Sequence, residues 1–317
     1  MRNRKTFLGL VCGILAAVSY GTNPLGALNL YADGLNVNSV IFYRYALATV
    51  ILGIMMAVQR KPFPVSRHEL SVLTSLGILM AGSSLALYSS FNYMDAGIAS
   101  TILFVYPVMV AVIMAVFYKE RVTAVTVVSI ALSLFGISML YRGGNGVTLS
   151  VAGVALVIIS SLTYAVYIVI VNKSTLRMSS VKLTFYVLLI GTLFILGYSF
   201  VGEGAELRPI SSFHSLAYAL MLAVFPTVIS LVLMVIAVHN IGSTPTAVLG
   251  ALEPITAVCI GVFVFGESFT ARIAVGITLI LCGVILIVAG KALPTQHITY
   301  VFSRLGRKVK KKWRWKG

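Results

Sequence analysis

Charged side chains are scarce in this sequence, and acidic ones are the scarcest. Of 317 residues, 24 are Lys or Arg and only 8 are Asp or Glu, so charged residues make up 10% of the chain. A soluble domain carries roughly 25% charged residues. Hydrophobic residues instead make up 59%, and the mean hydropathy is +1.00. The shortage of charge excludes a soluble domain, because most of this chain cannot face water.

Other shortages narrow the range of functions. The 3 cysteines, Cys12, Cys259 and Cys282, all fall in apolar stretches, which predicts buried free thiols and no disulfide framework. These stretches hold no paired histidines and no carboxylates at the spacing of metal ligands, so we expect neither an intramembrane enzyme nor a metal site. No Gly-rich phosphate cradle precedes a helix, so we expect no cofactor and no direct use of ATP.

Long apolar stretches recur from end to end, each about the ~20 residues that a helix needs to cross a bilayer. They lack the two-residue alternation of transmembrane strands, so helices are expected. The predicted fold is therefore an all-α polytopic membrane protein with ten transmembrane helices. The ten stretches are 7–28, 39–58, 70–92, 96–117, 123–141, 149–171, 182–201, 215–238, 244–265 and 270–290.

The distribution of Lys and Arg predicts the orientation. If the N-terminus is cytoplasmic, the inner segments hold 20 of the 24 cations, and the outer loops hold only Arg142, Arg208 and Arg272. Cytoplasmic loops carry such an excess of positive charge, so both termini are predicted to be cytoplasmic. The same bias accounts for the net charge of +16, and we expect no nucleic-acid partner.

The chain resembles itself after a shift of 147 residues, which places Pro107 on Pro254, Glu120 on Glu267 and Gly136 on Gly283. Nearer the N-terminus the shift is 144 residues and places Tyr20 on Tyr164. Because five helices is an odd number, the second copy enters the membrane from the opposite side. Such inverted repeats are typical of transporters with a solute site near the midplane.

The predicted organisation follows from this repeat: residues 1–145 and 146–291 form two five-helix units, and 292–317 form a basic tail. Within the units, small residues recur at intervals of seven, which lets helix backbones approach closely in lipid. These stripes are Ser129, Gly136 and Gly143 in the first unit, and Gly276, Gly283 and Gly290 in the second.

Several motifs recur in the order and spacing of a known family. They are "SYGTNP", "FYRYALA", "SSFNYMDAGIASTILFVYPVMVAVIMAVFYKE" and "HNIGSTPTAVLGALEPITAVCIGVFVFGE". Through residue 291 the chain resembles the drug/metabolite transporter superfamily, in its ten-helix bacterial branch built from two EamA domains. The resemblance implies a secondary exporter of amino acids, metabolites or toxic compounds in a bacterial cytoplasmic (inner) membrane. Tyr20 precedes Gly21 where many relatives have Trp, so the type of substrate does not carry over.

Glu253 is the foremost candidate for solute binding. It lies nine residues into the ninth stretch, about 13 Å deep at 1.5 Å per residue. A carboxylate near the bilayer centre is costly, so it is expected to face a cavity or a partner, or to be protonated. Glu253 can bind the amine of a solute or titrate during transport; alternatively, it is a buried carboxyl that holds a kink. Pro254 predicts that kink, as do Pro107 in the twin helix and Pro24 in the first stretch.

Arg44 is the only cation well inside an apolar stretch, because Lys182 and Arg272 lie within three residues of the start of theirs. One interpretation is that its side chain extends to the outer surface. The alternative is an ion pair with Asp33, Asp95 or Glu253, or a contact with a substrate carboxylate. Arg44 and Glu253 together can recognise the two ends of a zwitterion.

Other polar or amphipathic residues can line the same cavity. The competing interpretation for each is a hydrogen bond between helices. Pairs three or four residues apart, such as Tyr88 with Asn92, are expected to share a helix face. These candidates are Tyr20, Asn23, Tyr88, Asn92, Tyr164 and Tyr167.

The predicted function is export of a small organic solute, such as an amino acid, a metabolite or an amphipathic drug-like compound, by alternating access. A channel is the main alternative, and an intramembrane enzyme is less favoured. A monomer and a homodimer both stay open. The basic tail, which ends in "KKKWRWKG", is either a stop signal or an amphipathic helix on the anionic lipids of the inner leaflet.

Overall fold

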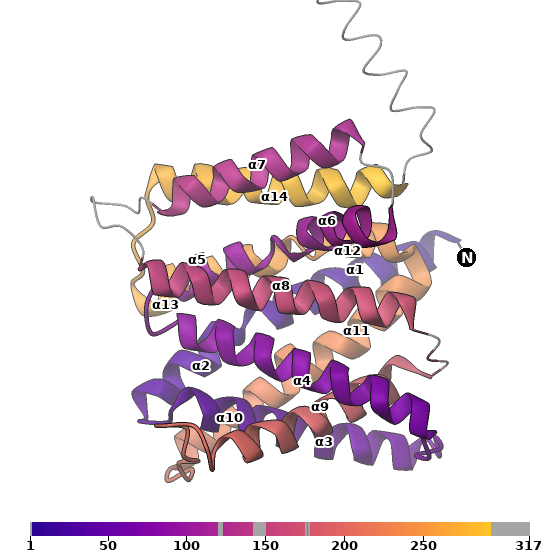
Figure 1. Cartoon of the computed structure of the whole chain (residues 1–317), viewed down its shortest axis with the longest axis vertical. Coiled ribbons are helices and arrows are strands. Elements are labelled where there is room, and N and C mark those ends of the chain that lie inside the picture. The colour runs from indigo at the N-terminus through magenta and orange to yellow at the C-terminus, as the bar shows by residue number, and fades with distance from the viewer. Residues whose placement is uncertain (1, 120–122, 142–149, 175, 177, 293–317) are drawn as a thin grey trace, which may run out of the picture.

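The computed structural model describes residues 2–119, 123–141, 150–174, 176 and 178–292. All regular elements in these residues are helices (Figure 1). The predictions for the basic tail, Glu120, Arg142 and Gly143 concern residues outside the described part. In chain order the elements are α1 (Arg2–Gly21), α2 (Asn23–Ala32), α3 (Val37–Val58), α4 (Arg67–Ser90), α5 (Ala96–Leu103), α6 (Tyr106–Tyr118), α7 (Ala124–Tyr141), α8 (Val151–Lys173), α9 (Ser180–Tyr198), α10 (Phe213–Ala223), η2 (Val224–Ile229), α11 (Ser230–Ile241), α12 (Ser243–Leu249), α13 (Leu252–Phe265) and α14 (Ala271–Ala292).

Seven helical segments are long and apolar enough to cross a membrane, counting helices in register across a break as one segment. Three further apolar helices of the described part are shorter, Ala124–Leu140, Leu252–Phe265 and Ala271–Leu286. Many large apolar side chains on the outside are exposed, such as Phe117 at 76% and Phe263 at 84%. Lipid is the environment that such a surface requires. The chain is therefore a multi-pass, all-helical membrane protein, while the count of ten crossings stays a prediction.

The three cysteines have free thiols, as expected, but only Cys12 is buried. The prediction of buried thiols was wrong for Cys259 and Cys282, which are exposed on α13 and α14. An apolar stretch in a membrane protein can face lipid as well as protein, so hydropathy alone does not separate these two environments.

Helices from the first 145 residues pack mainly against helices from the rest of the chain. The pairs are α1 with α11, α3 with α9, α4 with α8, α5 with α13, and α7 with α14. In Figure 1, α7 and α14 form a separate layer at the top, while the other pairs build the larger bundle below. The interface between the two parts of the sequence therefore lies inside this bundle.

The α7–α14 pair depends on the predicted small-residue stripes. A Cβ atom built on Gly136 would lie 2.8 Å from the carbonyl oxygen of Gly276, and one built on Gly283 would lie 2.8 Å from the carbonyl oxygen of Ser129. Neither position has room for a side chain, because backbone faces backbone. The prediction of close approach is confirmed here, and the two stripes face each other.

Three of the long helical segments, and the shorter α12–α13 segment, are interrupted. The breaks fall at Thr22 between α1 and α2, at 104–105 between α5 and α6, and at 250–251 between α12 and α13. Each precedes one of the prolines Pro24, Pro107 and Pro254 by two or three residues, because the proline ring removes a hydrogen bond and displaces the preceding turn. The fourth is the π-helical segment η2, which contains Pro226 and was not anticipated.

The connections gather at two ends of the bundle. Segments 33–36, 91–95, 199–212 and 266–270 lie at the left in Figure 1, which we call the Asp33 end. Segment 59–66 lies at the opposite end, which we call the Pro64 end, where Lys182 Nζ donates to the carbonyl of Pro64 at 2.7 Å. The helix breaks place irregular backbone between these ends, inside the bundle.

Candidate functional site

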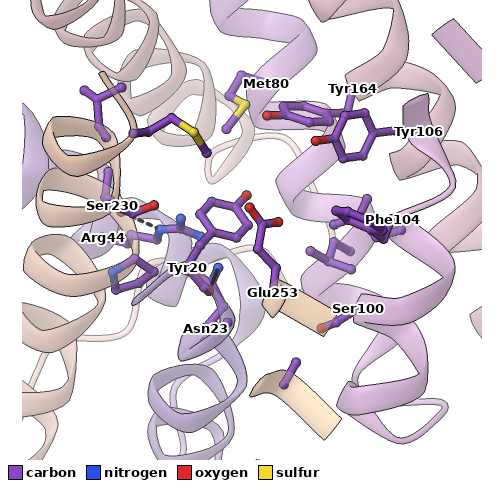
Figure 2. A pocket seen from close by; sticks show the side chains of 18 of the residues that line it. Tyr20, Asn23, Arg44, Met80, Ser100, Phe104, Tyr106, Tyr164, Ser230 and Glu253 are labelled. Carbon is purple, nitrogen blue, oxygen red and sulfur yellow. Dashed lines mark hydrogen bonds between the residues drawn. The ribbon is translucent and has the colours of Figure 1, made fainter. Parts of the chain in front are cut away.

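A cavity of about 230 Å³ lies among the broken helices. Side chains from α1, α3, α4, α8, α9, α11 and α13 line it, so both parts of the sequence contribute. Figure 2 shows charged, hydroxyl and aromatic groups converging on this space. Most of the remaining wall is apolar and includes Met80, Leu87, Leu103, Phe104, Leu188, Leu231 and Met234. This mixture of a few polar groups with an apolar wall is typical of a small-molecule site.

Glu253 reaches the cavity because the chain breaks just before it. Residues 250–251 separate α12 from α13, and the Glu253 N–H donates to the carbonyl of Gly250 at 2.9 Å. The carboxylate lines the cavity and points into it in Figure 2. Within the described part of the chain, its side chain takes part in no hydrogen bond and no ion pair. The acceptor capacity of this carboxylate is therefore available to a ligand.

Arg44 also lines the cavity, and only 4% of its surface is exposed. Its Nε donates to Thr227 Oγ1 at 3.0 Å and its Nη1 donates to the Tyr88 hydroxyl at 2.7 Å. The interpretation that this side chain extends to the outer surface is therefore wrong. Among the described residues no acid pairs with Arg44; the ion pair found there joins His214 to Asp33. The Tyr20 hydroxyl also lies within interaction range of this guanidinium, and an anionic group can approach the part of it that faces the cavity.

Tyr20 and Asn23 flank the break between α1 and α2. Asn23 Nδ2 donates to the carbonyl of Tyr20 at 2.8 Å, which occupies a carbonyl at the end of α1. Tyr20 interacts electrostatically with both Arg44 and Glu253, and Figure 2 draws its ring between those two side chains. Both residues line the cavity, as predicted for its wall.

The predicted pair Tyr88 and Asn92 is separated by the structure. Tyr88 is buried behind the cavity wall, where its hydroxyl accepts from Arg44 and donates to Asn23 Oδ1 at 3.0 Å. Asn92 is exposed and lines a different cavity at the Asp33 end. The helix α4 ends at Ser90, so the four-residue spacing does not place the two side chains on one helix face.

The helix α8 contributes Tyr164 and Tyr167 to another wall of the cavity. Their rings stack with centroids 5.6 Å apart, and Tyr106 meets Tyr164 edge-on at 4.7 Å. No hydrogen bond of these two hydroxyl groups is found within the described residues. The aromatic wall therefore offers flat apolar faces together with free hydroxyl groups.

Residues that the sequence did not single out complete the cavity. Tyr106 and Phe104 flank the break between α5 and α6, while Thr227 and Ser230 lie in or beside η2. Tyr106 carried a signal, because it stands where the twin helix has Glu253. Pro226 in an apolar stretch was the signal for η2. Among the described residues, no cluster of three or more His, Cys, Asp or Glu can hold a metal ion.

Hydrogen bonds connect the two parts of the sequence at the Asp33 end. Asn36 Nδ2 donates to the carbonyl of Glu206 at 2.7 Å, and Ser215 Oγ donates to Asp33 at 2.7 Å. The hydrogen bond from His214 lowers the pKa of Asp33, with a smaller effect from Ser215. Glu267 accepts from the first N–H groups of α5, at 2.7 Å from Ala96, and burial raises its pKa against the effect of these bonds.

The sequence is similar to those of known transporters. The sequence model described as the EamA-like transporter family matches residues 7–142 and 151–289. An "Uncharacterized transporter" of Archaeoglobus fulgidus is 26% identical over 273 residues, which cover 86% of this chain and 93% of that protein. The "Uncharacterized transporter YcbK" of Bacillus subtilis is 22% identical and the match covers 83% and 87% of the two chains.

A third relative, the "Uncharacterized inner membrane transporter YedA" of Escherichia coli K12, is 24% identical over 79% of this chain and 81% of its own. One solved structure, titled only "Crystal structure of protein", superimposes with a TM-score of 0.63 at 14% identity. The superposition covers 88% of this chain and 95% of that one. At this identity the likeness concerns the fold alone.

Proposed function

Because the chain belongs to the EamA-like transporter family, we propose that it is a secondary carrier that exports a small organic solute. It works by alternating access across a bacterial cytoplasmic membrane. Membership of this family makes the chain a transporter and not an enzyme. The identity of the solute and the mechanism of transport go beyond family membership and are proposals.

The observation that carries this proposal is the pair of uncompensated charges in one cavity. Glu253 takes part in no ion pair with described residues, and Arg44 interacts only with neutral groups, Tyr88, Thr227 and Tyr20. Charges this deep in a membrane protein are expensive and mark solute or ion pathways. A solute that carries an ammonium and a carboxylate compensates both charges at once.

The size and lining of the cavity narrow the solute further. A volume of about 230 Å³ suits a small molecule, and the aromatic and aliphatic wall suits an apolar side chain. We therefore propose a zwitterion with an apolar portion, with its amine on Glu253 and its carboxylate on Arg44. An apolar amino acid has this chemistry, and amphipathic compounds of similar size share it.

The pairing of helices supports an inverted repeat. If α1–α2 and α8 are counterparts in the two units, the contact of α1 with α11 corresponds to that of α8 with α4. The pairs α3 with α9, α5 with α13 and α7 with α14 each join an element to its own counterpart. A two-fold relation of two units produces this set of contacts, and it allows the units to rock around a central site.

Hydrogen bonds join the two units at both the Asp33 end and the Pro64 end, which favours a carrier over an open channel. On the Lys and Arg distribution this end faces outward and both termini face the cytoplasm. For export, the solute is loaded from the inner end and leaves through the Asp33 end. The tail at 292–317 is proposed to lie on anionic lipid of the inner leaflet, which deletion of 298–317 would test through the lipid dependence of flux.

The test is flux in liposomes that contain the purified chain. Amino acids and metabolites are screened with and without a proton gradient. Saturable flux of a zwitterion with an apolar side chain is expected. Glu253→Gln should lower its apparent affinity 10-fold or more, while Glu206→Gln, an exposed site outside the cavity, should not. Flux that rises linearly with concentration would indicate a channel and contradict the carrier. Wild-type flux in Glu253→Gln across a pH series would contradict the role of the carboxylate.

A further inference from the structure

A second cavity, of about 470 Å³, lies at the Asp33 end. Its wall comes from the α2–α3 connection, the last turns of α4 and α9, and the segment 203–208. It is roughly twice the size of the central cavity. Of the residues considered above for solute binding, only Asn92 lines it. The central solute site therefore leaves this space without a function.

Tyr88 contacts residues that line both cavities. The Tyr88 hydroxyl bonds to Arg44 and Asn23, which line the central cavity. The carbonyl of Tyr88 accepts from the hydroxyl of Tyr31 at 3.0 Å, and Tyr31 lines the second cavity. Tyr88 therefore connects the walls of the two cavities, of which the second lies at the Asp33 end.

The wall of the second cavity contains polar side chains with unused hydrogen-bonding capacity. Asn92 and Ser89 line it, and neither side chain makes a hydrogen bond within the described part of the chain. Asn38, which is 3% exposed, donates through Nδ2 to the carbonyl of Ala205 at 2.6 Å, but its Oδ1 has no partner. An unmatched buried acceptor is costly, so a donor that arrives beside it would be stabilised.

Asn36 differs from Asn92 and Ser89 in its hydrogen bonding. Asn36 also lines the cavity, yet its side chain is fully engaged: it accepts from the Ser39 N–H and donates to the carbonyls of Gly204 and Glu206. Asn36 therefore holds the connection together, whereas Asn92 and Ser89 are left for a ligand.

The second cavity also repeats the charges of the first. Glu203 and Arg208 both line it. Arg208 uses Nη1 for the carbonyl of Gly34 at 2.7 Å, and its Nη2 makes no hydrogen bond with described residues. Each cavity thus offers one carboxylate and one incompletely used guanidinium, the groups that bind an ammonium and a carboxylate.

We propose that the cavity at the Asp33 end is a second solute site, which holds the same class of zwitterion after it passes Tyr88. This inference rests on the proposed function, because it takes the class of solute from the central site. The second site is more exposed and more polar, so it binds more weakly and releases the solute outward.

The test counts binding sites on the purified full-length chain with radiolabelled L-phenylalanine, titrated into the millimolar range. Two sites are expected in the wild type. Ser89→Leu and Asn92→Leu fill the second cavity and should each remove the weaker site while leaving the tighter one within about twofold. Arg208→Gln should weaken it, and Glu253→Gln should remove only the tighter site. Ser71→Leu, the same change at an exposed position of α4, is the matched control.

Three results would count against the second site. If the wild type binds one molecule, with binding lost in Glu253→Gln and kept in Ser89→Leu and Asn92→Leu, the second site is wrong and the proposed function stands. If both sites survive the filled variants, the second site lies elsewhere and this assignment is wrong. If no saturable binding occurs, the proposed solute class fails and takes the second site with it. Because Asn92 is exposed, Asn92→Leu keeps the test valid if Ser89→Leu does not fold.

Discussion

The segments α5–α6 and α12–α13 occupy equivalent positions in the two parts of the sequence and are built alike. Each is a short helix, a break, and a second helix whose first turn contains a proline. At the break, however, α6 begins with Tyr106 whereas α13 presents Glu253. The shared backbone brings a side chain into the cavity in both cases, and the differing residue makes the cavity chemically asymmetric. A solute with unlike ends requires that asymmetry.

The largest effect is expected from removing the charge that distinguishes the two segments. Glu253→Gln keeps the size of the side chain but loses the contact with an ammonium. Hydrogen bonds to charged groups contribute about 1.5–3 kcal/mol, so the apparent affinity should fall 10-fold or more. The measurement is saturable flux in liposomes. Unchanged affinity in this variant would place the solute amine elsewhere.

The helix break before Glu253 should affect the apparent affinity for the solute more than the break before Tyr106. Pro254→Ala restores a backbone donor and favours a straighter α13, which turns the carboxylate away from Arg44. Loss of about 1 kcal/mol in solute contact corresponds to about a fivefold decrease in apparent affinity. Pro107→Ala in the twin segment is the matched control, and it is expected to have the smaller effect on flux. Equal effects of the two variants would mean that the breaks serve rocking and not the orientation of a charge.

A smaller effect is expected at Tyr106 itself. Tyr106→Phe keeps the edge-on contact with Tyr164 and removes only the hydroxyl. A neutral hydrogen bond contributes about 0.5–1.5 kcal/mol, so apparent affinity should fall about twofold to tenfold if the hydroxyl touches the solute, and not at all if only the ring does. Tyr106→Ala removes both and should lose more in either case. A Tyr106→Phe defect as large as that of Glu253→Gln would contradict the asymmetry between the two segments.

The smallest effect concerns Glu267, which follows α13 and accepts from the first N–H groups of α5. Burial raises its pKa in the folded chain, opposed by the bonds to Ala96 and Gly97, and Asp95 nearby raises it further. The folded state then binds a proton more tightly than the unfolded state, so stability decreases as pH rises from the ordinary glutamate pKa through the raised one. Glu267→Gln should remove this part of the pH dependence.

Thermal melting followed by circular dichroism over a pH series measures that slope. Asp95→Asn is the companion variant, and it should reduce the slope without abolishing it, because it removes only the neighbouring charge. Asp33 behaves oppositely: the hydrogen bond from His214 lowers its pKa, so its contribution is lost only in strong acid. A slope that persists unchanged in Glu267→Gln would assign the pH dependence to another group.

Much of the fold followed from hydropathy and spacing. The apolar stretches appear as helices, the stripes around Gly136 and Gly283 meet in the α7–α14 pair, and helix breaks precede Pro24, Pro107 and Pro254. These features depend on local chemistry, namely helix length, residue size and the missing proline donor. Such properties can be read along one segment without knowledge of its neighbours.

The environment of each polar residue could not be read in this way. Sequence spacing grouped Asn92 with Tyr88, whereas the end of α4 at Ser90 sends Asn92 to the second cavity. Depth alone left Arg44 free to reach the surface or an acid, whereas Tyr88 and Thr227 hold it in the cavity wall. The sequence alone determines which residues carry a charge. Their partners were decided by the tertiary structure, because a buried charge is positioned by groups from helices that are distant along the chain.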